Sequence, residues 1–295
     1  MSQHTQNLSR GAFYAFLLTF VAAGTAAASK YVSSAVPVPV IVLIQYLICC
    51  IGMLPWLSRC SLNDLKTPRW PEHLIRGLTG WTCFYTYYQA LEHIPLVDAT
   101  MLRTSSPLYV PIILWLWTGI RIPAARWLPI AIGFIGIYII LEPSSDDIKW
   151  WHLLGLVSGI TLAGSMVATR VLSKTEDTNL ILFYYFFISL LCSIPTGLAE
   201  WRPIPLWAWP YLIGIGLSIF FAMWMYTLSL SYTRASIVAP IGYFAVVVSG
   251  ILGWIIWGHA PTLKMAGGIL LVMTAGLLAI YLGAREEKLS AKRSG

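Results

Sequence analysis

Residues 37–57 read PVPVIVLIQYLICCIGMLPWL and contain no charged side chain. An α-helix rises about 1.5 Å per residue, so a stretch of this length is sufficient to cross about 30 Å of hydrocarbon. A helix that is apolar on all sides needs an apolar environment on all sides. The stretch therefore predicts a helix that spans a membrane.

Similar apolar stretches recur along the rest of the chain, separated by short polar breaks. Of the 295 residues, 58% are hydrophobic and only 11% are charged, and the mean hydropathy is +0.73. Soluble domains are about a quarter charged, so we expect an all-α polytopic membrane protein. The ten predicted spans are 11–29, 37–57, 74–91, 97–118, 127–141, 151–171, 179–198, 207–231, 236–257 and 262–282.

The sequence predicts neither a metal site nor a cofactor site. The five cysteines include no CxxC pair, and the five histidines lie at or outside span ends without metal-ligand spacing. Phosphate loops, dinucleotide fingerprints and nucleophile elbows are absent from the sequence, so we expect no enzyme. The net charge of +7 is scattered between apolar runs, which excludes a nucleic-acid patch. The expected partners are the bilayer and a small-molecule substrate, with the chain as a monomer or weak homodimer.

The basic residues predict the orientation, because Lys and Arg accumulate in short cytoplasmic loops. The test assumes that the N-terminus lies in the cytoplasm. Of the 19 Lys and Arg residues, Arg103 then lies within a span, 14 lie on the cytoplasmic side, and four lie outside: Lys30, Lys149, Arg202 and Lys264. We expect an inner-membrane protein with cytoplasmic tails at 1–10 and 283–295. The first span also resembles a cleavable signal sequence, but its removal would leave nine spans, so we expect it to be retained.

The chain contains a weak internal repeat with an offset of about 140 residues. Residues 98–99 and the ending WLWTG at 115–119 correspond to residues 234–235 and the ending WIIWG at 254–258. The repeat divides the chain into halves at 11–142 and 150–282, each with five spans. Because five is odd, the second half is inverted relative to the first, an arrangement typical of transporters.

Proline and glycine interrupt two spans at comparable places. The fourth span contains Ser105-Ser106-Pro107 and Pro111, and the ninth contains Ala239-Pro240-Ile241-Gly242-Tyr243. Each proline removes a backbone hydrogen bond and frees a carbonyl group, as in the discontinuous helices that bind transporter substrates. Ordinary helix kinks are the alternative interpretation.

Arg103 needs a partner, because an arginine within a membrane span costs from about 3 to more than 10 kcal/mol. One explanation is a permanent ion pair with Asp98 or Glu92. The other is a cation that lines a cavity and meets a carboxylate or phosphate of the substrate. No carboxylate lies in the middle of a predicted span, so Glu92 and Asp98 are also the candidates for coupling or gating.

Aromatic side chains follow one face of the third span. Trp81, Tyr85, Tyr88 and Glu92 are spaced i, i+4, i+7 and i+11, and Trp224 and Tyr243 are candidates from the second half. We predict that these aromatics contribute to substrate binding, although packing against lipid is an alternative. Thr161, Ser165 and Thr169 form a polar strip on the sixth span, which is also consistent with helix–helix contacts.

The chain resembles the EamA-type ten-helix carriers of the drug/metabolite transporter superfamily. The resemblance rests on residues 88–91 and 97–100, on Ser106-Pro107-Leu108, and on residues 235–240 with Tyr243. It implies that the protein transports a small organic metabolite, such as an amino acid or an S-adenosylmethionine-like compound, by alternating access, with the substrate cavity between the halves. The family often places an acidic residue after the glycine that closes each fourth helix, but here Ile120 follows Gly119 and His259 follows Gly258. The alternative is a membrane scaffold or an intramembrane enzyme in which Arg103 forms a structural ion pair.

Overall fold

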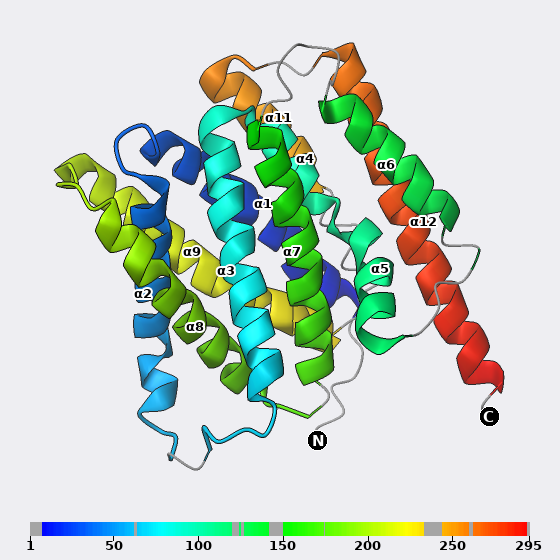
Figure 1. The fold of residues 1–295 in the computed structure, drawn as a ribbon, viewed down its shortest axis with the longest axis horizontal. Helices are drawn as coiled ribbons and strands as arrows, with labels where there is room; N and C mark the ends of the chain where they lie inside the picture. Colours follow the sequence, from blue (N-terminus) through cyan, green and yellow to red (C-terminus); the bar gives the residue numbers. More distant parts are fainter. Residues whose placement is uncertain are drawn as a thin grey trace.

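The structure is a computed structural model that describes residues 8–61, 64–119, 124, 127–141, 150–173, 175–232, 244–259 and 262–293. The regular elements in these ranges are all helices, which confirms the all-α fold (Figure 1). They are α1 (Leu8–Val32), α2 (Val38–Leu57), α3 (Trp70–His93), α4 (Leu96–Thr104), α5 (Ser106–Thr118), α6 (Trp127–Leu141), α7 (Trp150–Leu172), α8 (Thr178–Ala199), η2 (Leu206–Ala208), α9 (Trp209–Tyr232), α11 (Phe244–Trp257) and α12 (Leu263–Arg293).

The helices follow the predicted spans with one internal division. The fourth span is divided at Ser105 into α4 and α5. Four helical stretches in the described part of the chain are long and apolar enough to cross a membrane, namely 38–57, 150–172, 178–199 and 206–226. α3 is more polar, because it carries Glu72, Arg76 and Glu92.

Large apolar side chains cover the outside of the bundle. Leu116 and Ile255 are each 73% exposed, and Leu198 and Leu128 are among many others that face outward. A soluble protein rarely exposes so much contiguous apolar surface. We interpret this surface as the face in contact with lipid.

The helix pairs have a two-fold pattern. α3 packs on α7 as α9 packs on α1, α3 packs on α8 as α9 packs on α2, and α4 packs on α7 as α11 packs on α1. In each comparison, the second pair is obtained from the first by replacing every helix with its counterpart in the other half, five spans away along the chain. α2 with α8, α6 with α12 and α4 with α11 complete the set. Most of the helix packing therefore joins one half of the chain to the other.

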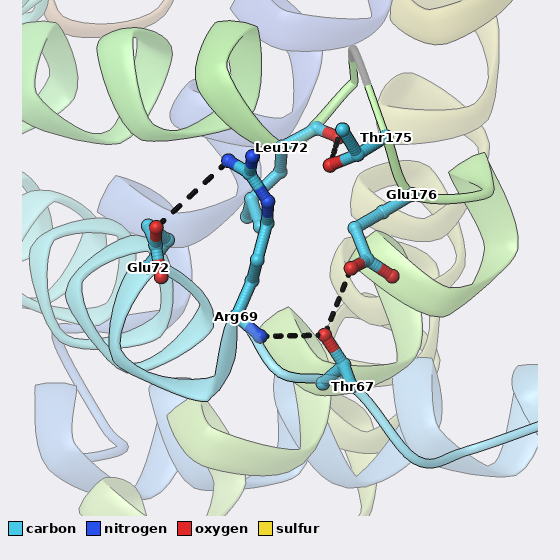
Figure 2. Close-up of polar contacts among 6 residues, drawn as sticks. All are labelled: Thr67, Arg69, Glu72, Leu172, Thr175 and Glu176. Carbon is cyan, nitrogen blue, oxygen red and sulfur yellow. Dashed lines mark hydrogen bonds and ion pairs between the residues drawn. The ribbon is translucent and has the colours of Figure 1, made fainter.

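Polar contacts join the α2–α3 connection to the turn between α7 and α8 (Figure 2). The Thr67 hydroxyl donates a hydrogen bond of 2.8 Å to Glu176 and accepts one of 3.0 Å from the Arg69 backbone N–H. The Tyr184 hydroxyl donates to the Leu65 carbonyl at 2.7 Å. These contacts link the two halves at the end of the bundle where α1 begins and α12 ends (Figure 1).

Candidate functional site

A cavity of about 230 Å³ lies between the two halves. Its walls come from α1, α3, α4 and α5 of the first half and from α7, α8, α9 and α11 of the second. Most of the lining is apolar or aromatic, with a small number of hydroxyl groups and two arginines. This composition is typical of sites that bind small organic molecules.

The cavity extends from the middle of the bundle toward one end. Its lining on α1 runs from Leu18 to Ala26, and its lining on α7 runs from Leu162 to Thr169. On α3 the lining starts at Arg76, close to the beginning of that helix. The cavity therefore points to the end at which α1 and α3 begin and α7 ends, where the contacts of Figure 2 also lie.

Arg103 lines the deeper part of the cavity, at the last turn of α4. Its guanidinium carbon lies 4.7 Å from the centre of the Phe84 ring and 4.8 Å from that of Tyr87. A cation is attracted to the faces of aromatic rings. The Nε–H group of Arg103 is buried and has no hydrogen-bond partner. The guanidinium is therefore held by the rings and retains donor capacity for a ligand.

The division between α4 and α5 places Arg103 at the cavity. Pro107 lies in the first turn of α5 and has no N–H group, so it cannot donate to the Arg103 carbonyl four residues earlier. Gly159 on α7 faces this division, where an added Cβ would collide with the Leu102 carbonyl. The close approach of α7 therefore requires glycine. Pro107 itself lines the cavity, whereas Pro111 lies inside α5 and is not part of the lining.

Arg76 lines the cavity as well, nearer to its outer end. We counted this residue among the cytoplasmic charges, at the start of the third predicted span; it lies within α3 and is only 7% exposed. Its Nη1 donates to the Ser165 hydroxyl, and its guanidinium carbon lies 3.9 Å from the centre of the Tyr185 ring. Its Nε–H group, like that of Arg103, has no hydrogen-bond partner. The cavity therefore contains a second cation.

Hydrogen bonds behind the cavity hold the tyrosines in place. Tyr88 donates to the Gln45 side-chain oxygen at 2.7 Å. The hydroxyl oxygens of Tyr87 and Thr100 lie 2.9 Å apart, and Tyr185 is paired in the same way with a tyrosine of α2. Buried hydroxyls with such partners cannot rotate freely. One ring beneath each arginine, Tyr87 beneath Arg103 and Tyr185 beneath Arg76, is therefore fixed.

The structure separates the predicted aromatic residues into different environments. Tyr88 lines the cavity. Trp81 and Tyr85 stack on each other with ring centres 5.1 Å apart and lie outside the lining. Trp224 is 47% exposed and also lies outside the lining. Pro240, Gly242 and Tyr243 lie outside the described residues.

Sequence reasoning missed the face of α3 that lines the cavity. That face carries Arg76, Gly80, Phe84 and Tyr87, which are spaced i, i+4, i+8 and i+11. The predicted stripe through Trp81 and Tyr85 is displaced from it by one residue. Both faces carry aromatic residues, so periodicity alone could not distinguish them. The available signal for the cavity face was Arg76 four residues before Gly80, because this spacing places both residues on the same face of the helix.

Glu92 and Asp98 lie at the other end of the bundle, near Lys30. The Lys30 ammonium donates to the backbone carbonyls of Leu91 and, at 2.7 Å, Ile94. Asp98 is fully buried, and both carboxylates interact electrostatically with Lys30. The main electrostatic interactions of Arg103 are instead with Cys83, Tyr87 and Tyr88.

Comparison with known proteins places these features in a family context. The chain matches the EamA-like transporter family twice, over residues 9–142 and 149–281. It is 31% identical over 269 residues to the Pseudopaline exporter CntI of Pseudomonas aeruginosa (strain UCBPP-PA14), a match that covers 90% of this chain and 94% of the relative.

Other relatives carry different substrate names. A Riboflavin transporter of Vibrio cholerae serotype O1 is 25% identical, over 88% of this chain and 89% of the relative. An S-adenosylmethionine uptake transporter of Rickettsia bellii is also 25% identical, over 94% of this chain and 95% of the relative. A solved structure described as "Crystal structure of protein" has a TM-score of 0.64, with 19% identity over 94% of this chain and 99% of that chain, and supports the fold alone.

Proposed function

The chain belongs to the EamA-like transporter family, and from this premise we propose that it is a secondary transporter for a small organic metabolite with an anionic or zwitterionic group. Its relatives are named as transporters of small molecules and not as enzymes. The observation that carries the proposal is Arg103 on the rings of Phe84 and Tyr87, inside a cavity between the halves.

The cavity suggests the chemistry of the substrate. Arg103 offers planar donors that fit a carboxylate or phosphate with two parallel hydrogen bonds. The rings of Phe84, Tyr87 and Tyr88 provide an apolar surface for a ring or hydrocarbon part. An amino acid or an S-adenosylmethionine-like compound has both features.

The alternative role for Arg103, a permanent ion pair, receives less support. In that account Asp98 or Glu92 would neutralise the guanidinium. Both carboxylates instead interact with Lys30, at the opposite end of the bundle from the cavity. We therefore assign Asp98 and Glu92 to gating at that end and Arg103 to the substrate.

We propose alternating access as the mechanism. The described lining of the cavity extends toward the end at which α3 begins, while Lys30, Leu91 and Ile94 pack the other end. Because the helix pairs follow a two-fold pattern, the same contacts can form with the ends reversed, so that the open end closes and the closed end opens. From the distribution of basic residues, the end to which the cavity points faces the cytoplasm of an inner membrane, with both termini on that side.

The test is a thermal-shift screen of the purified protein against amino acids, nucleosides, flavins and sulfonium compounds, because a ligand of the folded state raises its melting temperature. Arg103→Gln should abolish the shift that the best compound produces, while the protein still purifies as a single species. Arg202→Gln is the matched control, because Arg202 is exposed outside the helices. An equal shift in both variants would contradict the proposed role of Arg103.

Orientation needs a separate experiment. A single cysteine at Lys66 should be protected from an impermeant thiol reagent in intact cells, and one at Arg202 should react. The reverse pattern would invert the proposed topology.

A further inference from the structure

The cavity contains two arginines and, among its described lining residues, no aspartate or glutamate. Arg103 lies in its deeper part and Arg76 nearer its outer end. An arginine side chain remains protonated in proteins, so the cavity carries two full positive charges. In a site surrounded by hydrocarbon, two charges without counter-ions are strongly unfavourable. An anion with two charged groups would compensate both.

Both guanidinium groups are held by neutral partners. Arg76 contacts the Tyr185 ring and the Ser165 hydroxyl, and Arg103 contacts two aromatic rings. These contacts orient the side chains, and none of these described partners carries a negative charge. In each group the Nε–H is buried without a hydrogen-bond partner, and Arg76 is only 7% exposed. Both arginines are thus pre-positioned to donate to a ligand.

The distance between the two groups can be estimated along α3. The Arg76 guanidinium reaches the level of Gly80, because a Cβ at Gly80 would lie 2.8 Å from its Nη1. The Arg103 guanidinium lies between the rings of Phe84 and Tyr87. At 1.5 Å per residue, the two levels are about 6 to 10 Å apart along the helix axis. Charge-assisted hydrogen bonds of about 2.8 Å from each side take up more than half of this axial separation, so only a short diacid, lying obliquely to the helix axis, fits between the two groups.

We propose that Arg76 and Arg103 bind two separate anionic groups of one substrate, so that this carrier prefers small organic acids with at least two carboxylates. The proposal rests on the transport function proposed above and specifies its substrate class. One carboxylate lies at Arg103, against the rings of Phe84 and Tyr87. The second lies at Arg76, next to the Ser165 hydroxyl.

A purely structural role for Arg76 predicts a different outcome. Arg76 connects α3 to Ser165 on α7 and to Tyr185 on α8, so its removal could loosen the bundle. A structural role affects the melting temperature of the ligand-free protein and the binding of every ligand equally. A role in binding the second anion changes the preference between diacids and monoacids.

The experiment is calorimetric titration of the purified full chain with matched acids. Glutarate and succinate are the diacid probes, and valerate and butyrate, which have the same chain lengths with one carboxylate, are the controls. We expect at least one diacid to bind at least ten-fold more tightly than its monoacid, since charged hydrogen bonds of this kind change affinity by about 10- to 100-fold. Equal affinities within both pairs, or no binding of either diacid, would overturn the proposal without any variant.

The variants separate this proposal from the proposed function. Arg76→Gln should weaken diacid binding more than monoacid binding and so remove the preference for the diacid. If the glutamine variant does not fold, Arg76→Lys takes its place and should reduce the preference below that of the wild type, because an ammonium group cannot reproduce the planar fork of the guanidinium. Arg103→Gln should abolish binding of both acids. If the full wild-type preference survives in the folded Arg76 variant but binding is lost with Arg103→Gln, the two-anion proposal fails and the proposed function stands. If Arg103→Gln also binds normally, both fail.

Discussion

Replacement of Gly80 by alanine tests the position of Arg76 without changing any charge. Gly80 lies on the cavity face of α3, and an added Cβ would lie 2.8 Å from Arg76 Nη1 and 3.2 Å from the Ser165 hydroxyl oxygen. The same Cβ would collide with the ring of Tyr185, which is 1% exposed and hydrogen-bonded. The Tyr185 ring must therefore shift, and because the Arg76 guanidinium lies against that ring and close to the new Cβ, the substitution should displace the guanidinium as well.

The expected loss of stability follows from two opposing effects. Insertion of a methyl group into a packed site costs about 1–3 kcal/mol. Alanine is favoured over glycine in a helix by about 1 kcal/mol. Gly214→Ala is the matched control, because Gly214 also lies in a helix and a Cβ there would meet nothing within 4 Å. The control has the gain in helix propensity without the collision, so the two variants should differ by about 1–3 kcal/mol.

The assay combines thermal unfolding in detergent with glutarate titration. Gly80→Ala should unfold at a lower temperature than Gly214→Ala and should bind glutarate about ten-fold more weakly than the wild type, because the second anion loses its partner. Valerate affinity should not change. If Gly80→Ala matches the control in stability and the wild type in glutarate affinity, Arg76 does not occupy the position described here.

Three further changes test other parts of the site. Tyr88→Phe should destabilise the protein by about 1–3 kcal/mol, because the buried Gln45 oxygen loses its donor, and adding Gln45→Met should restore most of the melting temperature. Phe84→Ala should weaken substrate binding by about 3- to 30-fold in a titration through loss of the ring beneath Arg103, whereas Trp224→Ala should leave it unchanged; a larger effect of Trp224→Ala would return that residue to the site. Lys30→Met should lower the melting temperature through the loss of two hydrogen bonds to backbone carbonyls, and an unchanged value would indicate that Lys30 does not hold that end closed.

The helices themselves could be predicted from the sequence because the requirement for them is local. A bilayer provides no hydrogen-bond partners, so each apolar stretch must satisfy its own backbone as a helix. Span 127–141 has the same bounds as α6, and span 37–57 differs from α2 by one residue. The division of the fourth span near Pro107 was also predictable, because a missing N–H group acts on its own turn.

The side chains that face the cavity could not be predicted in the same way, because they depend on which helices meet. Aromatic residues cover both faces of α3, and only its packing against α7 and α8 directs Phe84 and Tyr87 inward and leaves Trp81 and Tyr85 outside the lining. The sequence indicated Arg76 only as a cytoplasmic charge at the start of the third span. Its burial depends on Ser165 and Tyr185, which are about 90 and 110 residues away in the sequence and come from the other half of the chain. Local pattern thus determined the spans, and the tertiary structure alone decided which charges share the cavity, because burial and pairing arise only when the two halves pack together.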